Sequence, residues 1–389
     1  MKICHAFLFF SIKFAGGTSD LMYKICKRQA ADGHNPVVYS GDYNFDKELA
    51  DTLPKVQFRV LKSYLDAAGF SIMPDLPKLA DNEVPQFDVV HMHVFRTFQN
   101  YVLWKKCKKY DIPFIMDPHG AVPYGTRKRW LKRLFDKLWG RQILYDAAFC
   151  VSGTHVGARE YKECAPDLPD DNIVILPQPF EMEQFKTIPE RGLFRQRYGI
   201  AEDKKVIMFL GRVHHIKGND FLVKGFAEYA KNNDDALLVI VGPDDGHMDA
   251  CKVVAEELGV QDKVIFTGFL GGDDKNSALR DADIVCQMSR QEHCAWAPFE
   301  AVMCGTPVIV TEHTGSGEDV QRADAGYTVV FDDVKGLSEK FEYVFAHYDE
   351  ALAKVKKAQG YITKNMSMDA LAKEYEGVYA RAIEKTKKA

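Results

Sequence analysis

The sequence lacks the cysteine patterns that hold small secreted domains or zinc sites together. Its nine cysteines are odd in number, scattered along the chain and never paired as Cys-x-x-Cys. A disulfide framework and a zinc ribbon are therefore not indicated, since both need paired cysteines at short spacing. This usage is typical of a reducing cytoplasm, which is the location we expect.

Long apolar runs and a basic excess are missing as well. No stretch approaches the roughly 20 apolar residues that a membrane-spanning helix needs. The opening apolar run is interrupted by Lys13 and is followed by no small-residue cleavage site, so we expect a buried first strand there and no signal peptide. A net charge of −4 argues against a general nucleic-acid-binding protein.

The 389 residues instead alternate between short apolar runs and stretches of helical periodicity. This alternation predicts βαβ units, hence an α/β fold with mostly parallel sheets covered on both faces. The expected strands are 2–10, 35–40, 87–93, 113–120 and 147–152, then 206–213, 237–242, 263–268, 283–289, 306–311 and 326–330. The clearest expected helices are 19–33, 100–111, 218–232 and 248–259.

The alternation pauses once, between Pro177 and about Lys204, where prolines and charged residues replace the strands. We interpret this stretch as the link between two similar domains that face each other across a cleft. The predicted domains are residues 1–180, completed by a C-terminal helix at about 370–389, and residues 181–369.

Ligands of such sheets bind beyond the carboxyl ends of the strands, so the turns after strands are the candidate sites. Gly16 and Gly17 follow the first strand and precede a helix. Paired glycines let the backbone approach a ligand, and a helix N-terminus favours an anion. A plain tight turn is the alternative, and the spacing is not that of a dinucleotide-binding motif.

A second turn carries two cations. Arg212 and Lys217 follow the strand at 206–210, between Gly211 and Gly218 and just before an expected helix. A guanidinium and an ammonium group beside a helix N-terminus are suited to a diphosphate. Two solvated surface cations are the alternative, which explains the flanking glycines poorly.

Two glutamates, Glu292 and Glu300, bracket seven residues ahead of a buried run. Taken alone, the stretch is also compatible with a loop that leads into a helix with Glu300 exposed. The wider set of motifs decides between these interpretations. It comprises the early Gly-Gly turn, DVVHMH (88–93), PHG (118–120), GRVHHIKG (211–218), VGPDDG (241–246), FTGFL (266–270), the two glutamates and CGTPVIV (304–310).

In this order the motifs resemble those of the retaining glycosyltransferases of family 4, which have the GT-B fold. The resemblance runs along essentially the whole chain. It implies two Rossmann-like βαβ domains facing each other across a deep cleft, with the nucleotide-sugar donor on the second domain and much of the acceptor on the first. It further implies transfer with retention at the anomeric carbon, without a metal or other cofactor.

The resemblance also assigns roles to residues. Arg212 and Lys217 match the diphosphate-binding positions, and Glu292 matches the glutamate that approaches the donor sugar. Glu300 matches the glutamate that accepts hydrogen bonds from ribose, and His119 matches the strand-end histidine that faces the transferred sugar. The other positions that match nucleotide-sugar-binding residues are Gly16, Gly17, Gly211, Gly242, Phe269, Leu270, Cys294, Ala295 and Trp296.

The chain departs from the family pattern after Glu292. The family usually has Gly-Phe-Gly-hydrophobe there, whereas this chain has His293, Cys294, Ala295 and Trp296. A left-handed backbone at Ala295 would cost on the order of 1 to 2 kcal/mol. A second departure is Gln178-Pro179, where the family commonly has Asn-Gly. The first departure leaves the sugar specificity open.

Asp281 and Asp283 have the Asp-x-Asp spacing by which other glycosyltransferases hold a divalent metal. They lie between an expected helix and a strand. We therefore expect helix-end and turn roles for them, and no metal site.

A basic stretch runs from Arg127 to Arg141, with seven Lys or Arg residues against Asp136 alone. Its apolar residues at helical spacing are Trp130, Leu131, Leu134, Phe135 and Leu138. One apolar and one basic face predict peripheral contact with anionic lipid at the inner face of the membrane, beside a lipid-linked acceptor. The alternative is a helix packed on the first domain with a solvated basic face.

We therefore expect transfer of a hexosyl unit from a UDP- or GDP-sugar to a hydroxyl of a glycan or lipid-linked acceptor, in cell-surface polysaccharide or glycoconjugate synthesis. A nucleotide-sugar epimerase or a phosphorylase of the same fold, and a binding protein without turnover, are the alternatives. A phosphorylase needs a cofactor-bearing lysine, and the epimerases lack the arrangement of Arg212, Lys217 and paired glutamates.

Overall fold

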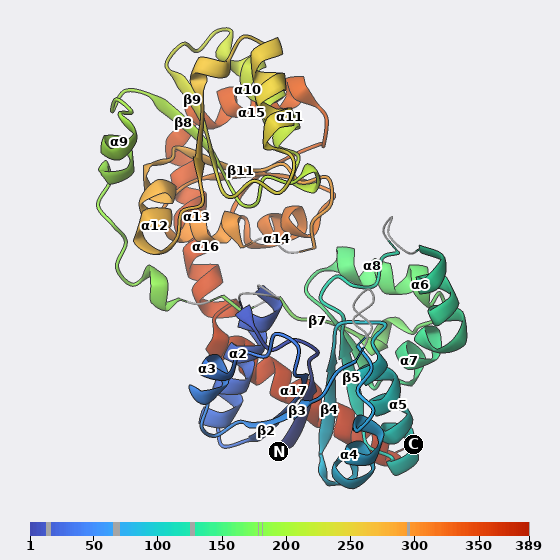
Figure 1. Ribbon diagram of the computed structural model, residues 1–389. Coiled ribbons are helices and arrows are strands. Elements are labelled where there is room, and N and C mark those ends of the chain that lie inside the picture. The colour runs from blue at the N-terminus through green and yellow to red at the C-terminus, as the bar shows by residue number, and fades with distance from the viewer. Residues whose placement is uncertain are drawn as a thin grey trace. The chain divides into compact units, whose positions relative to one another are not determined.

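The chain forms two compact α/β units (Figure 1). This computed structural model describes residues 1–12, 17–64, 71–124, 129–177, 179–180, 182–293 and 296–388. Unit 1 contains Met1–Pro179 and Met368–Ala389, and unit 2 contains Phe180–Ser367. The C-terminal helix α17 (Met368–Lys388) therefore belongs to unit 1, although the chain reaches it from unit 2.

Unit 1 is built on a seven-stranded parallel sheet with the order β3-β2-β1-β4-β5-β6-β7. The strands are β1 (Lys2–Ala6), β2 (Asn35–Gly41), β3 (Gln57–Leu61), β4 (Val89–His93), β5 (Phe114–Asp117), β6 (Phe149–Ser152) and β7 (Ile173–Ile175). The helices are α2 (Gly17–Ala31), α3 (Lys47–Asp51), α4 (Leu76–Glu83), α5 (Phe98–Tyr110), α6 (Arg129–Phe135), α7 (Arg141–Asp146), α8 (His155–Cys164) and α17, with a π-helical segment, η2 (Asp136–Gly140), between α6 and α7.

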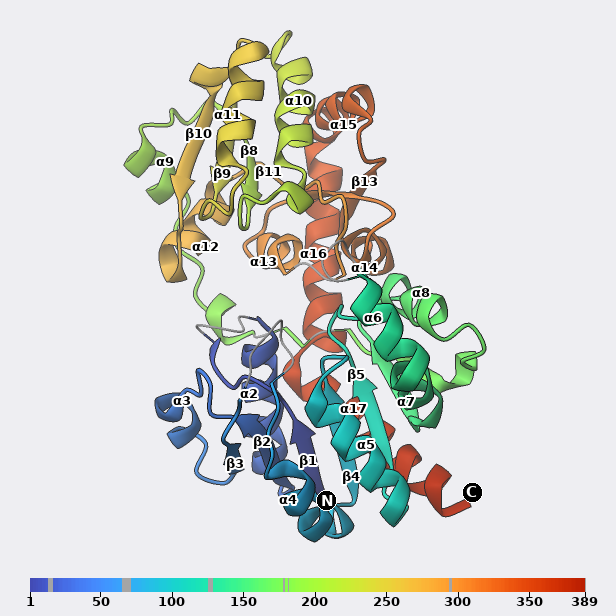
Figure 2. The ribbon, with the colours of Figure 1, turned by 45° about the vertical axis from the view of Figure 1, so that its right-hand side comes forward.

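The two faces of this sheet are covered by different helices. Ile3, Val89 and Ile115 point to one face, where they form a core with α2 and α17. Figure 2 shows α17, in red, lying along this face of the strands. The opposite face carries a larger apolar core packed against α4, α5 and α8. Side chains alternate along each strand, so His5, His91 and His93 share the face covered by α2 and α17.

Unit 2 repeats the plan with a six-stranded parallel sheet in the order β10-β9-β8-β11-β12-β13. The strands are β8 (Lys205–Leu210), β9 (Ala236–Val241), β10 (Val264–Gly268), β11 (Ile284–Gln287), β12 (Val308–Thr311) and β13 (Gly326–Val329). The helices are α9 (Leu193–Tyr198), α10 (Asn219–Ala230), α11 (Met248–Glu257), α12 (Gly272–Asp281), α13 (Ala297–Met303), α14 (Gly315–Ala323), α15 (Val334–Ala346) and α16 (Tyr348–Asn365).

The sheet of each unit reverses its strand order once. The reversal lies between β1 and β4 in unit 1 and between β8 and β11 in unit 2. In doubly wound sheets this reversal opens a crevice at the carboxyl ends of the two strands, and ligands bind there. The loops that follow β1, β4, β8 and β11 are therefore the places where the fold positions a site.

The structure contains a strand in every apolar run from which the sequence predicted one, and it adds β3 and β7. Both additional strands lie at the edges of the unit 1 sheet and are only partly buried. In β3 polar and apolar residues are mixed, whereas β7 lies in the short apolar run 173–176, from which no strand was predicted. None of the helices among the described residues is long and apolar enough to span a membrane.

Candidate functional site

The strand reversal in unit 2 brings the loops after β8 and β9 into contact. Gly242 follows β9, and a Cβ atom at this position would lie 1.8 Å from the carbonyl oxygen of Gly211. Gly218, which precedes α10, has φ +65°, and a Cβ atom there would lie 1.9 Å from the carbonyl oxygen of Met288 beyond β11. These glycines are thus required by close backbone approach, and they hold the loops after β8, β9 and β11 together.

The two predicted cations both lie on the loop after β8 and both are paired with acids. The Arg212 guanidinium donates to Asp245, in a pair whose side chains are 63% and 42% exposed. The Lys217 ammonium donates to Glu292 Oε2, and these side chains are only 19% and 12% exposed. Lys217 lies in a short 3₁₀ turn, His215–Lys217, directly ahead of α10.

Several hydrogen bonds fix Glu292 on the loop after β11. Ser289 Oγ donates to Glu292 Oε2 at 3.3 Å, and Gln287 Nε2 donates to Ser289 Oγ at 2.9 Å. Thr311 Oγ1, at the end of β12, donates to the Ser289 carbonyl at 2.8 Å. The structure therefore joins Lys217 to Glu292 at the strand reversal, where the fold favours a ligand, and it places Arg212 on the same loop as Lys217.

Glu300 lies in the first turn of α13 and has a lysine partner of its own. Lys275 Nζ, on α12, donates to Glu300 Oε1 at 2.6 Å, and both side chains are mostly buried. Among the residues that the structure describes, Glu300 Oε2 accepts no hydrogen bond. Each of the two predicted glutamates is thus held by one lysine, while one oxygen of Glu300 stays open to a hydroxyl donor.

Two features of this region were missed in the sequence. The sequence around Lys275 does not indicate a role at the site, because Lys275 reaches Glu300 only through the packing of α12 on α13. The second is the start of α14, where the Gly315 N–H donates to the Glu292 carbonyl at 2.7 Å and a Cβ on Gly315 would lie 1.8 Å from the His293 carbonyl. Thr314-Gly-Ser-Gly is a helix-start pattern that could have indicated it.

The remaining predicted donor-side residues are placed unevenly. Phe269 is 73% exposed, whereas Leu270 packs against the core of unit 2. The Trp296 ring stacks on Phe180 with ring centroids 5.8 Å apart. Gly17 is the first residue of α2. Gly16, Cys294, Ala295 and Gln178 lie outside the described residues, so the departures at Ala295 and Gln178 stay predictions.

Asp281 and Asp283 have structural roles, as the sequence predicted. Asp281 is buried and accepts hydrogen bonds from the backbone N–H groups of Gly192, Phe194 and Arg195 at 2.6 to 3.0 Å, which caps the start of α9. Asp283 Oδ2 accepts from Arg195 at 2.9 Å and from the Val206 N–H at 2.8 Å. Both carboxylates are fully used in joining α9 to the sheet.

In unit 1, His119 lies two residues after β5 in a left-handed backbone conformation, with φ 49°. Its side chain is only 6% exposed, and both ring nitrogens face protein groups. Nε2 is 2.9 Å from His93 Nδ1, and Nδ1 is 3.2 Å from Asp117 Oδ1. The predicted contact between His119 and the transferred sugar stays a prediction, and in this conformation the ring is turned into unit 1.

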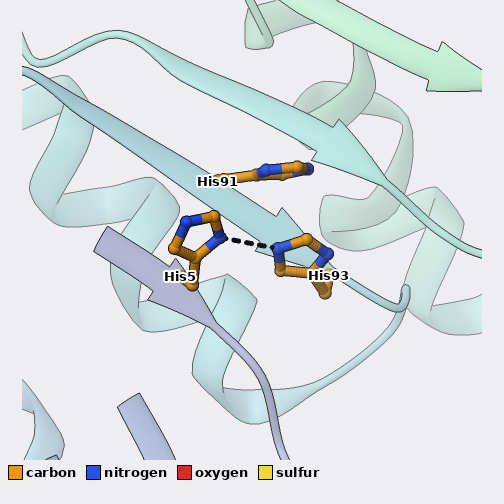
Figure 3. Close-up of side chains that lie close together, drawn as sticks. All are labelled: His5, His91 and His93. Atoms are coloured by element: carbon orange, nitrogen blue, oxygen red, sulfur yellow. Dashed lines mark hydrogen bonds between the residues drawn. The ribbon is translucent and has the colours of Figure 1, made fainter. Parts of the chain in front are cut away.

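His119 is the outer member of a buried histidine group, whose other members, His5, His91 and His93, are drawn in Figure 3. Burial lowers the pKa of His5 to about 4, and it holds the pKa values of His91 and His93 well below the ordinary value of 6.5. Burial also raises the pKa of Asp117. The imidazoles are therefore neutral, and two sets among the described residues have metal-ligand spacing: His5, His91 and His93, and His93, Asp117 and His119.

The basic stretch forms α6, η2 and α7 on unit 1. Phe135 packs into the core, so it does not share the exposed face with the other apolar residues. The exposed apolar side chains are Trp130 (68%), Leu131 (42%), Leu134 (46%) and Leu138 (52%). Asp136 is turned inward, where Arg96 binds it with two hydrogen bonds of 2.9 and 2.7 Å. The outer surface of this segment thus combines apolar side chains with the cations of Arg129, Lys137 and Arg141.

Two family matches cover most of the chain. Residues 190–360 match the family described as Glycosyl transferases group 1, and residues 15–184 match the family described as Glycosyltransferase Family 4. An uncharacterized glycosyltransferase of Methanocaldococcus jannaschii is 28% identical over 312 residues, which are 79% of this chain and 78% of the relative. A D-inositol 3-phosphate glycosyltransferase of Geodermatophilus obscurus is 25% identical over 311 residues, 76% of this chain and 68% of the relative. Matches to several further relatives cover 33 to 53% of those proteins' length.

Solved structures agree in fold. HepE of Anabaena, solved in complex with UDP, has a TM-score of 0.79 at 15% identity, with 98% of this chain and 100% of HepE covered. Sucrose-phosphate synthase of Thermosynechococcus elongatus has a TM-score of 0.73 at 16% identity, with 99% and 100% covered. The predicted family and fold class are confirmed: the chain belongs to the glycosyltransferases of group 1 and family 4, and its two Rossmann-like units are those of the GT-B fold.

Proposed function

We propose that this glycosyltransferase moves a hexosyl unit from a nucleoside-diphosphate sugar, UDP- or GDP-linked, to a hydroxyl of a glycan or lipid-linked acceptor, with retention at the anomeric carbon. The observation that carries the proposal is the joining of Lys217 and Glu292 at the strand reversal of unit 2, with Arg212 on the same loop. Related structures support the donor class, since HepE was solved with UDP and with UDP-glucose.

Arg212 and Lys217 are proposed to bind the diphosphate. Their charges are balanced by Asp245 and Glu292. The exposed Arg212–Asp245 pair is worth only about 0 to 1 kcal/mol, so Arg212 can exchange its partner for phosphate oxygens at little cost. As the bond between sugar and diphosphate breaks, negative charge grows on the leaving group, and preorganised cations lower that barrier.

The two glutamates are proposed to bind different parts of the donor. Glu300 accepts from the ribose hydroxyls through Oε2, while Lys275 holds Oε1 in place. Glu292 accepts hydrogen bonds from the donor sugar, and its ion pair with Lys217 keeps it beside the diphosphate. Both carboxylates act as hydrogen-bond acceptors for hydroxyl groups, which matches the chemistry of ribose and hexose.

Transfer is proposed to need no metal, because Arg212 and Lys217 supply the cations and the Asp-x-Asp carboxylates are used in capping α9. The acceptor is proposed to bind unit 1, with His119 and the start of α2 on the acceptor side. The exposed apolar and basic surface of α6, η2 and α7 supports a lipid-linked acceptor and a location at the cytoplasmic face of the membrane, in cell-surface polysaccharide or glycoconjugate synthesis.

A thermal-shift screen tests the donor class directly. UDP, GDP, ADP and their common sugars are added to the full chain, and one nucleoside diphosphate is expected to raise the melting temperature more than the others. A transfer assay with the selected sugar and a crude lipid acceptor follows, with the anomeric configuration of the product determined by NMR. Inversion would contradict the retaining mechanism, and no stabilisation by any nucleotide would contradict the donor class.

A further inference from the structure

A single hydrogen-bonded chain crosses the interior of unit 1 from the end of β5 to α17. It starts at Asp117 and His119 and continues through His93 and His5, which are 3.1 Å apart from Nε2 to Nδ1. His5 Nε2 is then 2.8 Å from Gln29 Oε1 on α2. Figure 3 shows the link between His5 and His93 and the neighbouring ring of His91.

The far end of this buried chain lies on the C-terminal helix. Gln29 Nε2 donates to Tyr379 Oη at 3.1 Å, and Tyr379 Oη is 2.9 Å from His91 Nδ1. Among the described residues, His91 Nε2 has no hydrogen-bond partner. His5, His91, His93 and Tyr379 are all at most 1% exposed. Asp117, His119, His93, His5, Gln29, Tyr379 and His91 are therefore linked as one network and not as separate pairs.

The direction of one link in this chain fixes the direction of the next. A neutral imidazole has one N–H donor and one acceptor nitrogen. Because Gln29 Oε1 accepts from His5 Nε2, His5 Nδ1 accepts from His93 Nε2. His93 Nδ1 then accepts from His119 Nε2. His119 Nδ1 is left as an acceptor that faces Asp117 Oδ1 at 3.2 Å, so one proton must lie between these two atoms.

A metal ion explains the group less well. It would need the ring nitrogens of three histidines at about 2.0 to 2.1 Å, each in the plane of its ring. The His91 and His93 rings instead overlap, with centroids 3.8 Å apart and an interplanar angle of 36°. The chain, in contrast, also accounts for Gln29, Tyr379 and Asp117.

We propose that Asp117 and His119 share one proton at the end of β5, and that His93, His5 and Gln29 are positioning residues that keep it there. The shared proton makes the pair neutral. The benefit rests on the proposed function together with the predicted contact between His119 and the transferred sugar: an ionised Asp117 with a neutral His119 would repel an anionic nucleotide sugar, and the neutral pair does not.

The surroundings of the pair favour the proton. The titratable groups around Asp117 are His5 of β1, His91 and His93 of β4, Tyr161 of α8, and Tyr375 and Tyr379 of α17. Burial lowers the pKa values of these histidines and raises those of the tyrosines, so all are neutral near pH 7. Burial likewise raises the pKa of Asp117, in agreement with a retained proton.

The first test is the tautomer of each histidine, measured on the full chain by two-bond ¹⁵N–¹H correlation after ¹⁵N-histidine labelling, without any donor. His5 and His93 are expected as Nε2–H tautomers at pH 7, and both should convert together to Nδ1–H as the shared proton is lost at higher pH. Nδ1–H tautomers at pH 7, independent titration of the two rings, or one equivalent of tightly bound zinc in the protein would each overturn the assignment.

The second test separates donor binding from turnover. The donor KM of the wild type is expected to rise at least about tenfold as the proton leaves the pair, with a smaller change in kcat. Asp117→Asn donates a fixed N–H to His119 Nδ1, so its donor KM should be low and independent of pH. A KM that depends on pH in this variant as it does in the wild type would contradict the proposal.

A matched pair of glutamine variants tests the role of Gln29 at the far end of the hydrogen-bonded histidine network. Gln29→Leu should shift the rise in donor KM to lower pH, because nothing then holds His5 in the Nε2–H form. Gln99→Leu removes another buried glutamine, which donates to the Tyr39 carbonyl and does not belong to the hydrogen-bonded histidine network. It should leave the pH dependence of the donor KM unchanged. Identical profiles for both variants would overturn the positioning role. Expected tautomers without any sugar transfer would contradict only the proposed function.

Discussion

Lys217 and Glu292, 75 residues apart in the sequence, form an ion pair that joins the loop after β8 to the loop after β11. These two loops flank the reversal of strand order in unit 2. The groups proposed to bind the diphosphate and the donor sugar are thus held together by this pair, and a mutation of either residue leaves a mostly buried charge without its partner.

Arg212→Ala and Lys217→Ala should both lower the transfer rate by about 100 to 1,000-fold, since each removes a preorganised cation from the leaving group. Their effects on stability should differ. Lys217→Ala deprives Glu292 of its partner and should cost about 1.5 to 3 kcal/mol, whereas the exposed pair of Arg212 is worth about 0 to 1 kcal/mol. Kinetics and urea unfolding measure the two effects, with the exposed Lys231→Ala as control. Near-wild-type transfer in both variants would refute the diphosphate site.

Glu300→Ala and Glu292→Ala should separate nucleotide binding from transfer. Glu300→Ala is expected to weaken binding of the bare nucleoside diphosphate by about 1.5 to 3 kcal/mol, because the ribose contacts exist without a sugar. Glu292→Ala should nearly preserve that affinity and lower the transfer rate, since its contact matters as charge develops. Calorimetry with the nucleotide and a transfer assay with the donor test the division. Equal losses of affinity would show that the roles are assigned wrongly.

Asp283→Ala should lower the free energy of unfolding and should not make transfer depend on a metal ion. Arg195 is buried and loses its carboxylate partner, which costs about 3 to 5 kcal/mol. The wild type should retain full transfer activity in excess chelator. Activity that is lost in chelator and restored by manganese would instead make Asp281 and Asp283 metal ligands.

The fold was predictable because each buried parallel strand is a compact apolar run, and the runs are regularly separated by amphipathic stretches. The edge strand β3 was missed because its polar and apolar residues are mixed, and β7 was missed although residues 173–176 form a short apolar run. A C-terminal helix at about 370–389 that completes the first domain was part of the sequence prediction, but its long-range packing through Tyr375, Val378 and Tyr379 is displayed by no local pattern.

The site was predictable only where chemistry is local. Arg212, Lys217 and their glycines form one short motif, and the structure joins it to Glu292. Lys275 and Asp245, which hold Glu300 and Arg212, are distant or unremarkable in sequence and were missed. The HMH stretch was noted as a motif, but the sequence could not show that Gln29 and Tyr379 link its histidines into one network.

The buried histidines predict a loss of stability in acid. Their folded pKa values lie below the unfolded value of 6.5, with that of His5 at about 4, so protonation favours the unfolded chain. This stability is complete above pH 6.5 and falls as the pH drops toward 4. Asp117 acts in the opposite direction, because burial raises its pKa. Each histidine should contribute a slope of about 1.4 kcal/mol per pH unit.

Urea unfolding at several pH values between 4.5 and 7.5 measures this slope. His91→Phe fills the same buried space with a ring that cannot be protonated, so its unfolding free energy should fall less steeply in acid than that of the wild type. His313→Phe changes a histidine whose side chain is 86% exposed and serves as the control, with a slope like that of the wild type. A slope unchanged in His91→Phe would show that this ring is not held neutral by burial.

The surface of α6, η2 and α7 predicts binding to anionic membranes. Leu131, Leu134 and Leu138 recur at helical spacing and are exposed, and Asp136, the only acid of the stretch 127–141, is held inside by Arg96. Apolar burial and charge attraction then act together, with each cation near an anionic surface worth about 1 kcal/mol. The chain should sediment with vesicles that contain 30% phosphatidylserine and not with pure phosphatidylcholine vesicles.

Two variant sets divide these contributions. Changing Leu131, Leu134 and Leu138 to serine should abolish insertion, seen as loss of the blue shift in Trp130 fluorescence, and should weaken sedimentation at any salt concentration. Changing Arg129, Lys137 and Arg141 to glutamine should remove the preference for anionic lipid and the sensitivity to salt, because screened attraction is what these residues supply. Transfer to a water-soluble acceptor should be unaffected in both sets. Wild-type sedimentation by both variants would return this segment to the alternative interpretation, a helix that packs on unit 1 with a solvated basic face.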